Sequence, residues 1–418
     1  MRRVYFGSNV FHCQSKRFEE NMSIICTDGR IEALVRGRVQ PAPDMEFVDI
    51  SGKWTIPGLV NVHEHQTYKR LVGPLFGPGG SFFQVTEAEL TMRAVRSALY
   101  ALRHGVTTVF EAGARGDVPF AMRRSIEKGF FPGPRMYIAG AALSITGGHG
   151  CELCHEVDTP DEMRRQVRLA FKQGVDGIKL LASEEPVAES NAYGEPVIAE
   201  LSEEMIRAAV EEAHRVHRRV FIHGMGVEQL TRSIRGGVDV IHHGAFLNRE
   251  MARQMREQGI TLVPTLSSYR LTAHPRFARG ETWSREHRAL WPAFDAAVQA
   301  ALEEGVSIAI GTDSVGDFRH EMQMLHRRGM TREDCLVAAT WGGAKAIGAD
   351  RIVGSIEAGK SADLAVLNQN PLDDLAALNS MALVVREGVP YQPETLRLPA
   401  LSGEQAFVEA FALTEEWM

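Results

Sequence analysis

Two histidines one residue apart, His63 and His65, end the apolar segment TIPGLVNV in the stretch VNVHEHQ, residues 60–66. Successive side chains of an extended strand point to opposite faces, so both imidazoles should project to one side while Val62 and Glu64 face away. Two imidazoles on one side of a strand can hold a metal ion between them. The stretch therefore predicts a buried strand that ends in two metal ligands.

The segments that must position this pair alternate between short apolar strands and stretches with apolar residues at helical spacing. Helical spacing is found, for example, in residues 87–105, 161–174, 202–217 and 293–305. Eight strand candidates lie at 59–65, 107–113, 135–143, 177–183, 219–225, 238–244, 260–266 and 306–314. Eight strand-then-helix units predict the α/β class and a closed (β/α)₈ TIM barrel.

Strand-like segments flank the predicted barrel at both ends of the chain. Residues 1–57 contain short strands and a hairpin signal at Asp28-Gly29, and residues 352–395 return to strand patterning. We expect these two segments to form one composite β-sandwich domain beside a barrel of residues 58–351. Residues 396–418 are predicted to be a C-terminal helical tail.

Side chains suited to metal binding lie on the predicted strands, mostly at their carboxyl ends, which all open onto one face of such a barrel. Imidazoles and carboxylates are the ligands that zinc accepts, and a catalytic zinc keeps one position for water. A buried neutral lysine can react with CO₂ to form a carbamate that bridges two metals; an ion pair with a carboxylate is the alternative. The candidate ligands are His63, His65, Lys179, His223, His243 and Asp313.

In combination, these motifs resemble the amidohydrolase superfamily over nearly the whole chain. The matching segments are IPGLVNVHEH, GIKLLAS, FIHG, IHHG and GTDS, followed by VGSIEAGKSADLAVLNQNPLDDL near the C-terminus. The segment SITGGHG at 144–150, with GVDGIKLLAS after it, is similar to a branch that contains Xaa-Pro dipeptidase-like and arginine carboxypeptidase-like enzymes. That branch cleaves C-terminal amino acids from dipeptides or N-acyl amino acids.

The resemblance implies a centre of two divalent metal ions, with zinc as the expected metal. One ion is assigned to His63, His65 and Asp313, and the other to His223 and His243. Asp313 is then also the general base, which accepts a proton when a metal-bridging hydroxide attacks the amide carbon. The expected reaction is hydrolysis of an amide-type C–N bond.

Three further positions bear on the ligand set. The resemblance implies that Lys179 is carboxylated and bridges the ions. His242 competes with its neighbour His243, but strand alternation should turn one ring inward and the other outward, and the family pattern selects His243. Gly226 occupies the place where a mononuclear deaminase of the superfamily would carry a glutamate, which favours a binuclear hydrolase.

Substrate contacts are expected from three residues near the strand ends. His149, within TGGHG, is a candidate catalytic residue that would bind the substrate or polarise its carbonyl; the alternative is an ordinary loop residue. Tyr269 follows the seventh strand and would line the pocket or pack in the core. Met225 stands where branch members carry a polar residue, so the substrate's carboxylate would be recognised differently.

Composition narrows the class of protein. The formal net charge is -7 and no apolar run reaches 18 residues, which argues against nucleic-acid and membrane roles. Five cysteines without a secretory signal suit a cytoplasmic location, and CELCH at 151–155 matches a haem-attachment pattern but lacks its usual context. We expect a small-molecule substrate and, by family analogy, a homo-oligomer.

Other functions remain open at this point. The same site could hydrolyse a cyclic amide, a urea or an ester. A mononuclear deaminase and a non-catalytic scaffold with the same fold are further alternatives. The scaffold should have lost ligands, whereas this sequence offers all six.

Overall fold

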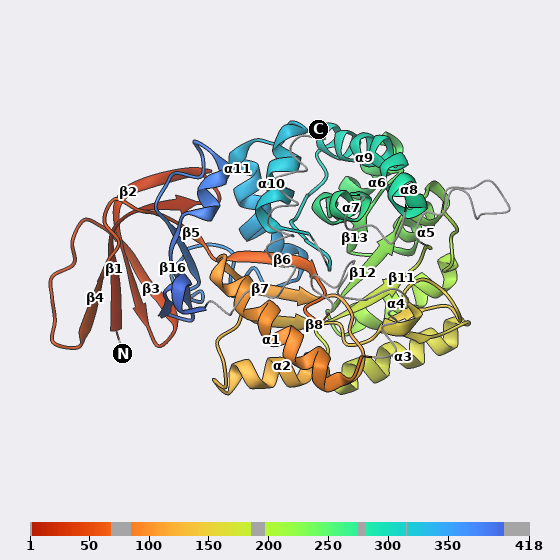
Figure 1. Ribbon diagram of the computed structural model, residues 1–418, viewed down its shortest axis with the longest axis horizontal. Helices are drawn as coiled ribbons and strands as arrows, with labels where there is room; N and C mark the ends of the chain where they lie inside the picture. Colours follow the sequence, from red (N-terminus) through yellow and green to blue (C-terminus); the bar gives the residue numbers. More distant parts are fainter. Residues whose placement is uncertain (1, 68–84, 185–196, 275–280, 315, 397–418) are drawn as a thin grey trace.

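The computed structural model describes residues 2–67, 85–184, 197–274, 281–314 and 316–396. A sheet built from both ends of the chain lies beside a barrel of parallel strands that is surrounded by helices (Figure 1). The predicted C-terminal helical tail lies outside the described residues from residue 397 on. The α/β class and the barrel architecture predicted from the sequence are confirmed.

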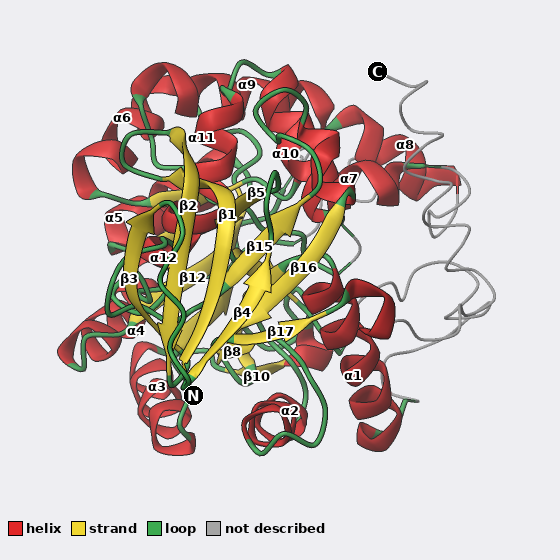
Figure 2. Cartoon of the chain, turned by 90° about the vertical axis from the view of Figure 1, so that its left-hand side faces the viewer, coloured by secondary structure: helices red, strands yellow, loops and turns green. Residues whose placement is uncertain are grey.

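The end sheet joins five N-terminal strands to three C-terminal ones in the order β17-β16-β15-β5-β1-β2-β3, with β4 paired to β1 (Figure 2). The predicted turn at Asp28-Gly29 connects β2 to β3, and both of its residues have positive φ, at 49° and 80°. The C-terminal β15 pairs with the N-terminal β5, so the two ends of the chain share one sheet. Its strands are β1 Arg2–His12, β2 Arg17–Thr27, β3 Arg30–Arg36, β4 Met45–Asp49, β5 Trp54–Pro57, β15 Leu364–Leu367, β16 Met381–Arg386 and β17 Val389–Tyr391.

The barrel strands are parallel and follow the predicted order, with two local differences, and a short additional strand, β10, pairs with β9. The third predicted strand divides into β8 and β9, because Gly140 between them has a φ of 69° and breaks the extended backbone. The eighth, at 306–314, forms only isolated bridges, to β14 and to β6, and these close the barrel. The strands are β6 Leu59–Glu64, β7 Val106–Glu111, β8 Arg135–Ile138, β9 Ala142–Ser144, β10 Cys154–Glu156, β11 Gly177–Leu181, β12 Arg219–Gly224, β13 Val240–His243 and β14 Thr261–Val263.

Several helices begin where the sequence supplies caps. Thr86 and Glu89 form a reciprocal capping box at the start of α1, and Thr159 and Glu162 do the same at α3. Within the described residues, no helix is both long and apolar enough to cross a membrane. The helices are α1 Glu87–Arg103, α2 Val118–Glu127, α3 Pro160–Gln173, α4 Glu203–Arg215, α5 Val227–Gly236, α6 Arg249–Gln258, α7 Leu266–Ala273, α8 Glu281–Ala289, α9 Trp291–Glu304, α10 Phe318–Arg327, α11 Arg332–Val337 and α12 Gly343–Ala346.

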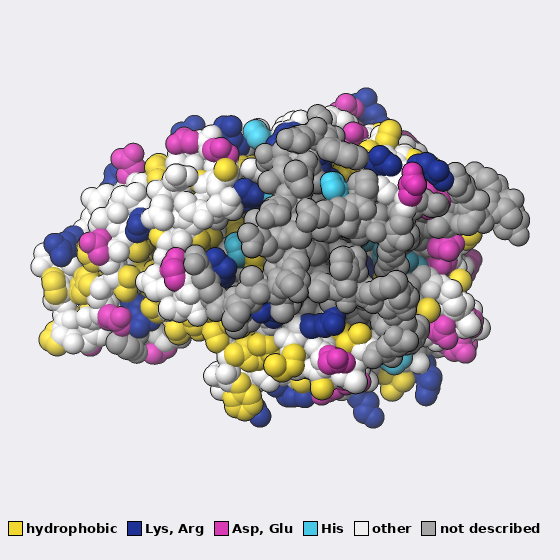
Figure 3. Space-filling view, viewed as in Figure 1, with side chains coloured by type: hydrophobic (Ala, Val, Ile, Leu, Met, Phe, Trp, Pro, Cys, Tyr) yellow, Lys and Arg dark blue, Asp and Glu magenta, His cyan; other side chains and the backbone are white. Residues whose placement is uncertain are grey.

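Charges of both signs are interspersed over the surface, as expected for a chain with a small net charge (Figure 3). Hydrophobic side chains gather at the lower edge of this view, over α1 and α2. Met92 and Phe130 are exposed there. Exposed apolar side chains are ordinary on protein surfaces.

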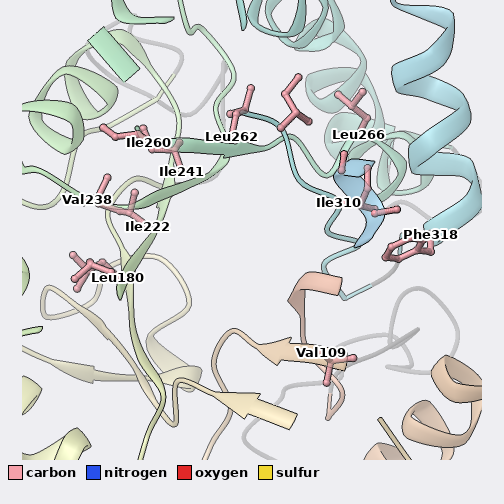
Figure 4. Packing of buried hydrophobic residues seen from close by; sticks show 14 of the residues in the cluster. Val109, Leu180, Ile222, Val238, Ile241, Ile260, Leu262, Leu266, Ile310 and Phe318 are labelled. Atoms are coloured by element: carbon pink, nitrogen blue, oxygen red, sulfur yellow. The ribbon is translucent and has the colours of Figure 1, made fainter. Parts of the chain in front are cut away.

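The two faces of the barrel strands carry different kinds of side chain. Leu180, Ile222 and Ile241, from three adjacent strands, are fully or almost fully buried in the large apolar cluster that includes helix residues (Figure 4). Because side chains alternate along a strand, the residues next to them face the inside of the barrel. These neighbours include Lys179 and His223, so packing of the outer face directs the polar residues inward.

Phe110 on β7 and Phe221 on β12 stack inside the barrel with ring centroids 3.9 Å apart. We predict that Phe110→Ala lowers the free energy of unfolding by about 3–5 kcal/mol, because it leaves a cavity that the closed barrel cannot fill. Urea denaturation measures this, with Phe110→Leu as the milder comparison. A loss below about 1 kcal/mol would show that the stack contributes little beyond surface packing.

Candidate active site

Three predicted ligands converge beyond the end of β6. His63 Nε2 and His65 Nε2 are 3.2 Å apart, and Asp313 Oδ1 lies 3.9 Å from the former and 3.7 Å from the latter. All three potential ligand atoms lie within 4.8 Å of one another. Both rings are buried, so a metal ion is well suited to occupy the point on which they converge. We call these three residues the first ligand group.

The end of β6 is not a regular strand. Between Asn61 and Glu64 it carries one more residue than β7, which makes a β-bulge. Val62 consequently packs inside the barrel, whereas Glu64 lines a cavity beside α1 and α10. The expectation that these two side chains share a face is therefore wrong, although His63 and His65 do lie together as predicted.

Backbone hydrogen bonds fix Asp313 against β6. The backbone N–H groups of Thr312 and Asp313 both donate to His63 O, at 2.9 and 2.8 Å. Asn61 Oδ1 accepts from His63 N and from Thr312 N, at 3.3 and 3.2 Å. Asp313 has a φ of 53°, in the left-handed region. These bonds hold that conformation and set the separation between the carboxylate and the two imidazoles.

The remaining predicted histidines adjoin the first ligand group. The ring of His243 lies 5.1 Å from that of His63 and 4.5 Å from that of His223, measured between centroids. His149, in the loop after β9, stacks on His223 at 4.3 Å. These histidines come from separate strands and a loop, and the barrel brings them to one mouth.

Lys179 contacts the same cluster through His242, the histidine that strand alternation was expected to turn outward. Its Nζ lies 2.6 Å from His242 Nδ1, and the ring of His242 stacks on that of His63 at 3.9 Å. Alternation predicted that only one of the two adjacent histidines faces inward. His243, however, ends β13 with a φ of 72°, so both rings enter the cluster. The signal that could have revealed this was the glycine at position 244, which marks the end of the regular strand.

The donor atoms fit a bound metal. His65 Nδ1 bonds to Gly113 O at 2.8 Å, which leaves its Nε2 for a ligand. The Thr265 hydroxyl donates to Pro264 O and must therefore accept from His243 Nδ1, 2.6 Å away, which again leaves Nε2 free. His223 Nε2 is buried without a hydrogen-bond partner among the described residues. Imidazole nitrogens held in this way are ready for coordination.

Burial sets the protonation of the site. It lowers the pKa of Lys179 to about 7, so a substantial fraction of the amine is neutral near physiological pH. Burial likewise lowers the pKa of His243 to about 3 and that of His63 well below its ordinary value. Burial raises the pKa of Asp313, but His65, His243 and a backbone N–H outweigh it, so the net shift is downward. The imidazoles are thus neutral and the aspartate ionised at neutral pH.

The predicted substrate contacts differ in their surroundings. Tyr269 on α7 places its ring edge-on to His243 at 5.2 Å, in contact with the site. Met225 is fully buried in the large apolar cluster that also contains Leu230 and Ala245. The backbone N–H of His149 donates to both carboxylate oxygens of Glu200, at 3.0 and 3.1 Å. Binding of substrate by these residues stays a prediction.

A model of the amidohydrolase family matches residues 54–390, from β5 through β17. The chain belongs to the amidohydrolase family. An ochratoxinase from Aspergillus niger is 30% identical over 315 residues, which cover 68% of this chain and 64% of that relative. The chain thus spans just under two thirds of that relative's length.

Solved amidohydrolase structures match over more of the chain. A Xaa-Pro dipeptidase with bound methionine in its active site has a TM-score of 0.84 and 26% identity, covering 94% of this chain and all of that one. A putative prolidase from Bifidobacterium longum has a TM-score of 0.81 and 28% identity, covering 98% of this chain and 99% of the other. These matches confirm the superfamily resemblance inferred from the motifs.

The lowered imidazole pKa values predict an acid-labile apoprotein. The pKa of His243 is about 3 in the folded chain and 6.5 as a free side chain, so below pH 6.5 the unfolded chain binds the proton more readily. Neutral burial of His243 therefore removes up to about 1.4 kcal/mol of stability per pH unit between pH 6.5 and about 3. Urea denaturation of metal-free protein at pH 7 and pH 5 should show this loss. In His243→Asn, the loss of stability between pH 7 and pH 5 should be smaller by about 2 kcal/mol. A loss as large as that of the wild type would contradict the low pKa assigned to His243.

Proposed function

We propose that this amidohydrolase binds two divalent ions, with zinc expected, and hydrolyses the amide C–N bond of a dipeptide or N-acyl amino acid. The observation that carries the proposal is the first ligand group lying directly beside the pair His223 and His243. Two adjacent sets of neutral imidazoles around one ionised carboxylate are suited to two cations. The match over the whole length of a Xaa-Pro dipeptidase supports the choice of substrate class.

Lys179 is proposed to be the bridge between the ions. An ammonium group among imidazoles repels cations, whereas its neutral amine can attack CO₂ and lose one proton to give a carbamate anion. The pKa of Lys179, lowered to about 7 by burial, supports this reaction at neutral pH. The contact with His242, which stacks on His63, holds the lysine beside the first ligand group.

When bound, divalent ions lower the pKa of a coordinated water and polarise a carbonyl. Asp313 is ionised at neutral pH and would accept the proton of the attacking water, then pass it to the departing amine. Backbone N–H of Ser314 donates to its Oδ1 at 2.6 Å, and Ser268 Oγ lies 3.4 Å from its Oδ2. These contacts hold the carboxylate in place during both transfers.

His149 is proposed to bind the substrate. Its ring stacks on His223, and its backbone is held by Glu200, so it lies at the edge of the centre on a fixed loop. An imidazole in this place could donate a hydrogen bond to the carbonyl oxygen of the scissile amide. Tyr269 would line the opposite part of the pocket, beside His243.

A non-peptide amide is the second candidate substrate. The observation that favours it is the 30% identity to an ochratoxinase over 68% of this chain. The catalytic groups would act in the same way, and only the groups that recognise the leaving amine would differ. Ochratoxin therefore belongs in the same assay as the dipeptides.

Zinc-loaded protein should release amino acids from Xaa-Pro dipeptides, other dipeptides or N-acyl amino acids. Ochratoxin, cyclic amides and aryl ureas should be tested as comparison substrates in the same assay. Metal analysis should find two ions per chain. Ammonia release from an aminated heterocycle without amide cleavage would identify a deaminase instead. A wild-type protein that carries no metal and cleaves nothing would end the enzyme hypothesis.

Lys179→Ala should lower kcat/KM by at least about 10²-fold, because a lost bridging ligand should cost more than an outer-shell partner does. Protein treated with ¹³C-bicarbonate should show a carbamate carbon by NMR in the wild type and lack it in the variant. Lys172→Ala, at the end of α3, is the matched control for an exposed lysine. A fully active Lys179→Ala would refute the bridge.

A further inference from the structure

The start of α7 is held by a carboxylate from another helix. Its N-cap residue, Thr265, makes no capping bond to the helix and has a φ of 53°. Instead, the backbone N–H groups of Leu266 and Ser267 donate to the two carboxylate oxygens of Glu321 on α10, at 2.9 and 2.6 Å. Glu321 is fully buried. A long-range side chain therefore satisfies two N–H groups that a helix N-terminus leaves unpaired.

This helix start contacts two predicted metal ligands that lie far apart in the sequence. The Thr265 hydroxyl bonds to His243 Nδ1 at 2.6 Å, and Ser268 Oγ lies 3.4 Å from Asp313 Oδ2. His243 belongs to one proposed ion and Asp313 to the other. If the first turn of α7 moved, the orientations of His243 and Asp313 would both change.

The loop that leads from Asp313 into α10 packs against the same turn. The backbone N–H of Asp317 donates to Ser267 Oγ at 3.2 Å. At Gly316, an added Cβ would lie 2.5 Å from Ser267 Oγ and 3.1 Å from Ser268 N, so the two backbones approach closely. The carboxylate, the loop and the turn are thus packed as one unit around the site.

A left-handed φ at a β-branched residue is strained and persists only where its surroundings impose it. At Thr265 the surroundings that impose it are the two bonds to Glu321 and the bonds of the hydroxyl. Without the carboxylate acceptors, Thr265 has a lower-energy conformation available in which its hydroxyl no longer faces His243. The helix start would then lose its fixed position.

We propose that Glu321 is a positioning residue for the metal centre, which fixes the start of α7 so that Thr265 and Ser268 orient His243 and Asp313. This inference rests on the proposed function, since it requires the metal centre. It differs from a purely stabilising role, because stabilisation alone would leave the metal affinity of the folded protein unchanged.

Zn²⁺ affinity, measured by competition with a chelator, tests the proposal directly. Glu321→Gln keeps the shape but replaces one acceptor oxygen with a donor, so we expect Zn²⁺ to bind about 10–100-fold more weakly, as for other groups that orient ligands. Thr265→Val should weaken binding similarly, whereas Thr265→Ser, which keeps the hydroxyl, should restore it. Since Glu321 acts partly through Thr265, the loss of affinity in the double variant Thr265→Val with Glu321→Gln should be smaller than the two single losses combined.

The matched control is Glu212→Gln on α4, where another buried carboxylate pairs with Arg168 and Arg215 away from the site. It should lower stability without changing Zn²⁺ affinity. Wild-type affinity in Glu321→Gln, or fully additive effects in the double variant, would overturn the positioning role. If Glu321→Gln does not fold, Thr265→Val with unchanged affinity would overturn it as well. A wild-type protein that binds no Zn²⁺ would contradict both this proposal and the proposed function. A wild-type protein that binds Zn²⁺ but cleaves no substrate would contradict the proposed function alone.

Discussion

Burial of imidazoles, a lysine amine and a carboxylate at one mouth of the barrel is the constraint on which the structure depends. Polar groups removed from water are costly unless they find partners. Here the partners are chiefly one another: His63 faces His65, His242 contacts Lys179, and some ring nitrogens remain without a protein partner among the described residues. A divalent cation bound at this mouth would give such nitrogens a partner.

The backbone departs from regular geometry where the barrel meets this cluster. β6 bulges between Asn61 and Glu64, and His243, Thr265 and Asp313 all have positive φ. Each departure ends a regular strand or begins a helix at the place where a side chain must turn into the site. Residues held in rare conformations tend to concentrate at functional sites, because the surrounding structure supports their strain.

The candidate site is shared between the barrel strands and the segments that follow them. In the proposed site, the barrel strands carry the candidate metal ligands, and the segments after them, including the loop of His149 and the start of α7, would supply the groups nearest to a substrate. Members of the family that act on different amides can therefore keep one centre and change its rim. Specificity is accordingly the property least determined by membership of the family.

Local periodicity and short motifs were enough to predict the strand-and-helix alternation, the turn at Asp28-Gly29 and the identity of the first ligand group, because all three are encoded by neighbouring residues. The folded chain was needed to show that His242 joins the cluster and that Val62 and Glu64 lie on different faces of β6. Both depend on where a strand stops being regular, which is set by hydrogen bonds to distant residues. Glu321 was likewise invisible in the sequence, since its partners lie more than fifty residues away and only packing of α10 against α7 brings them together.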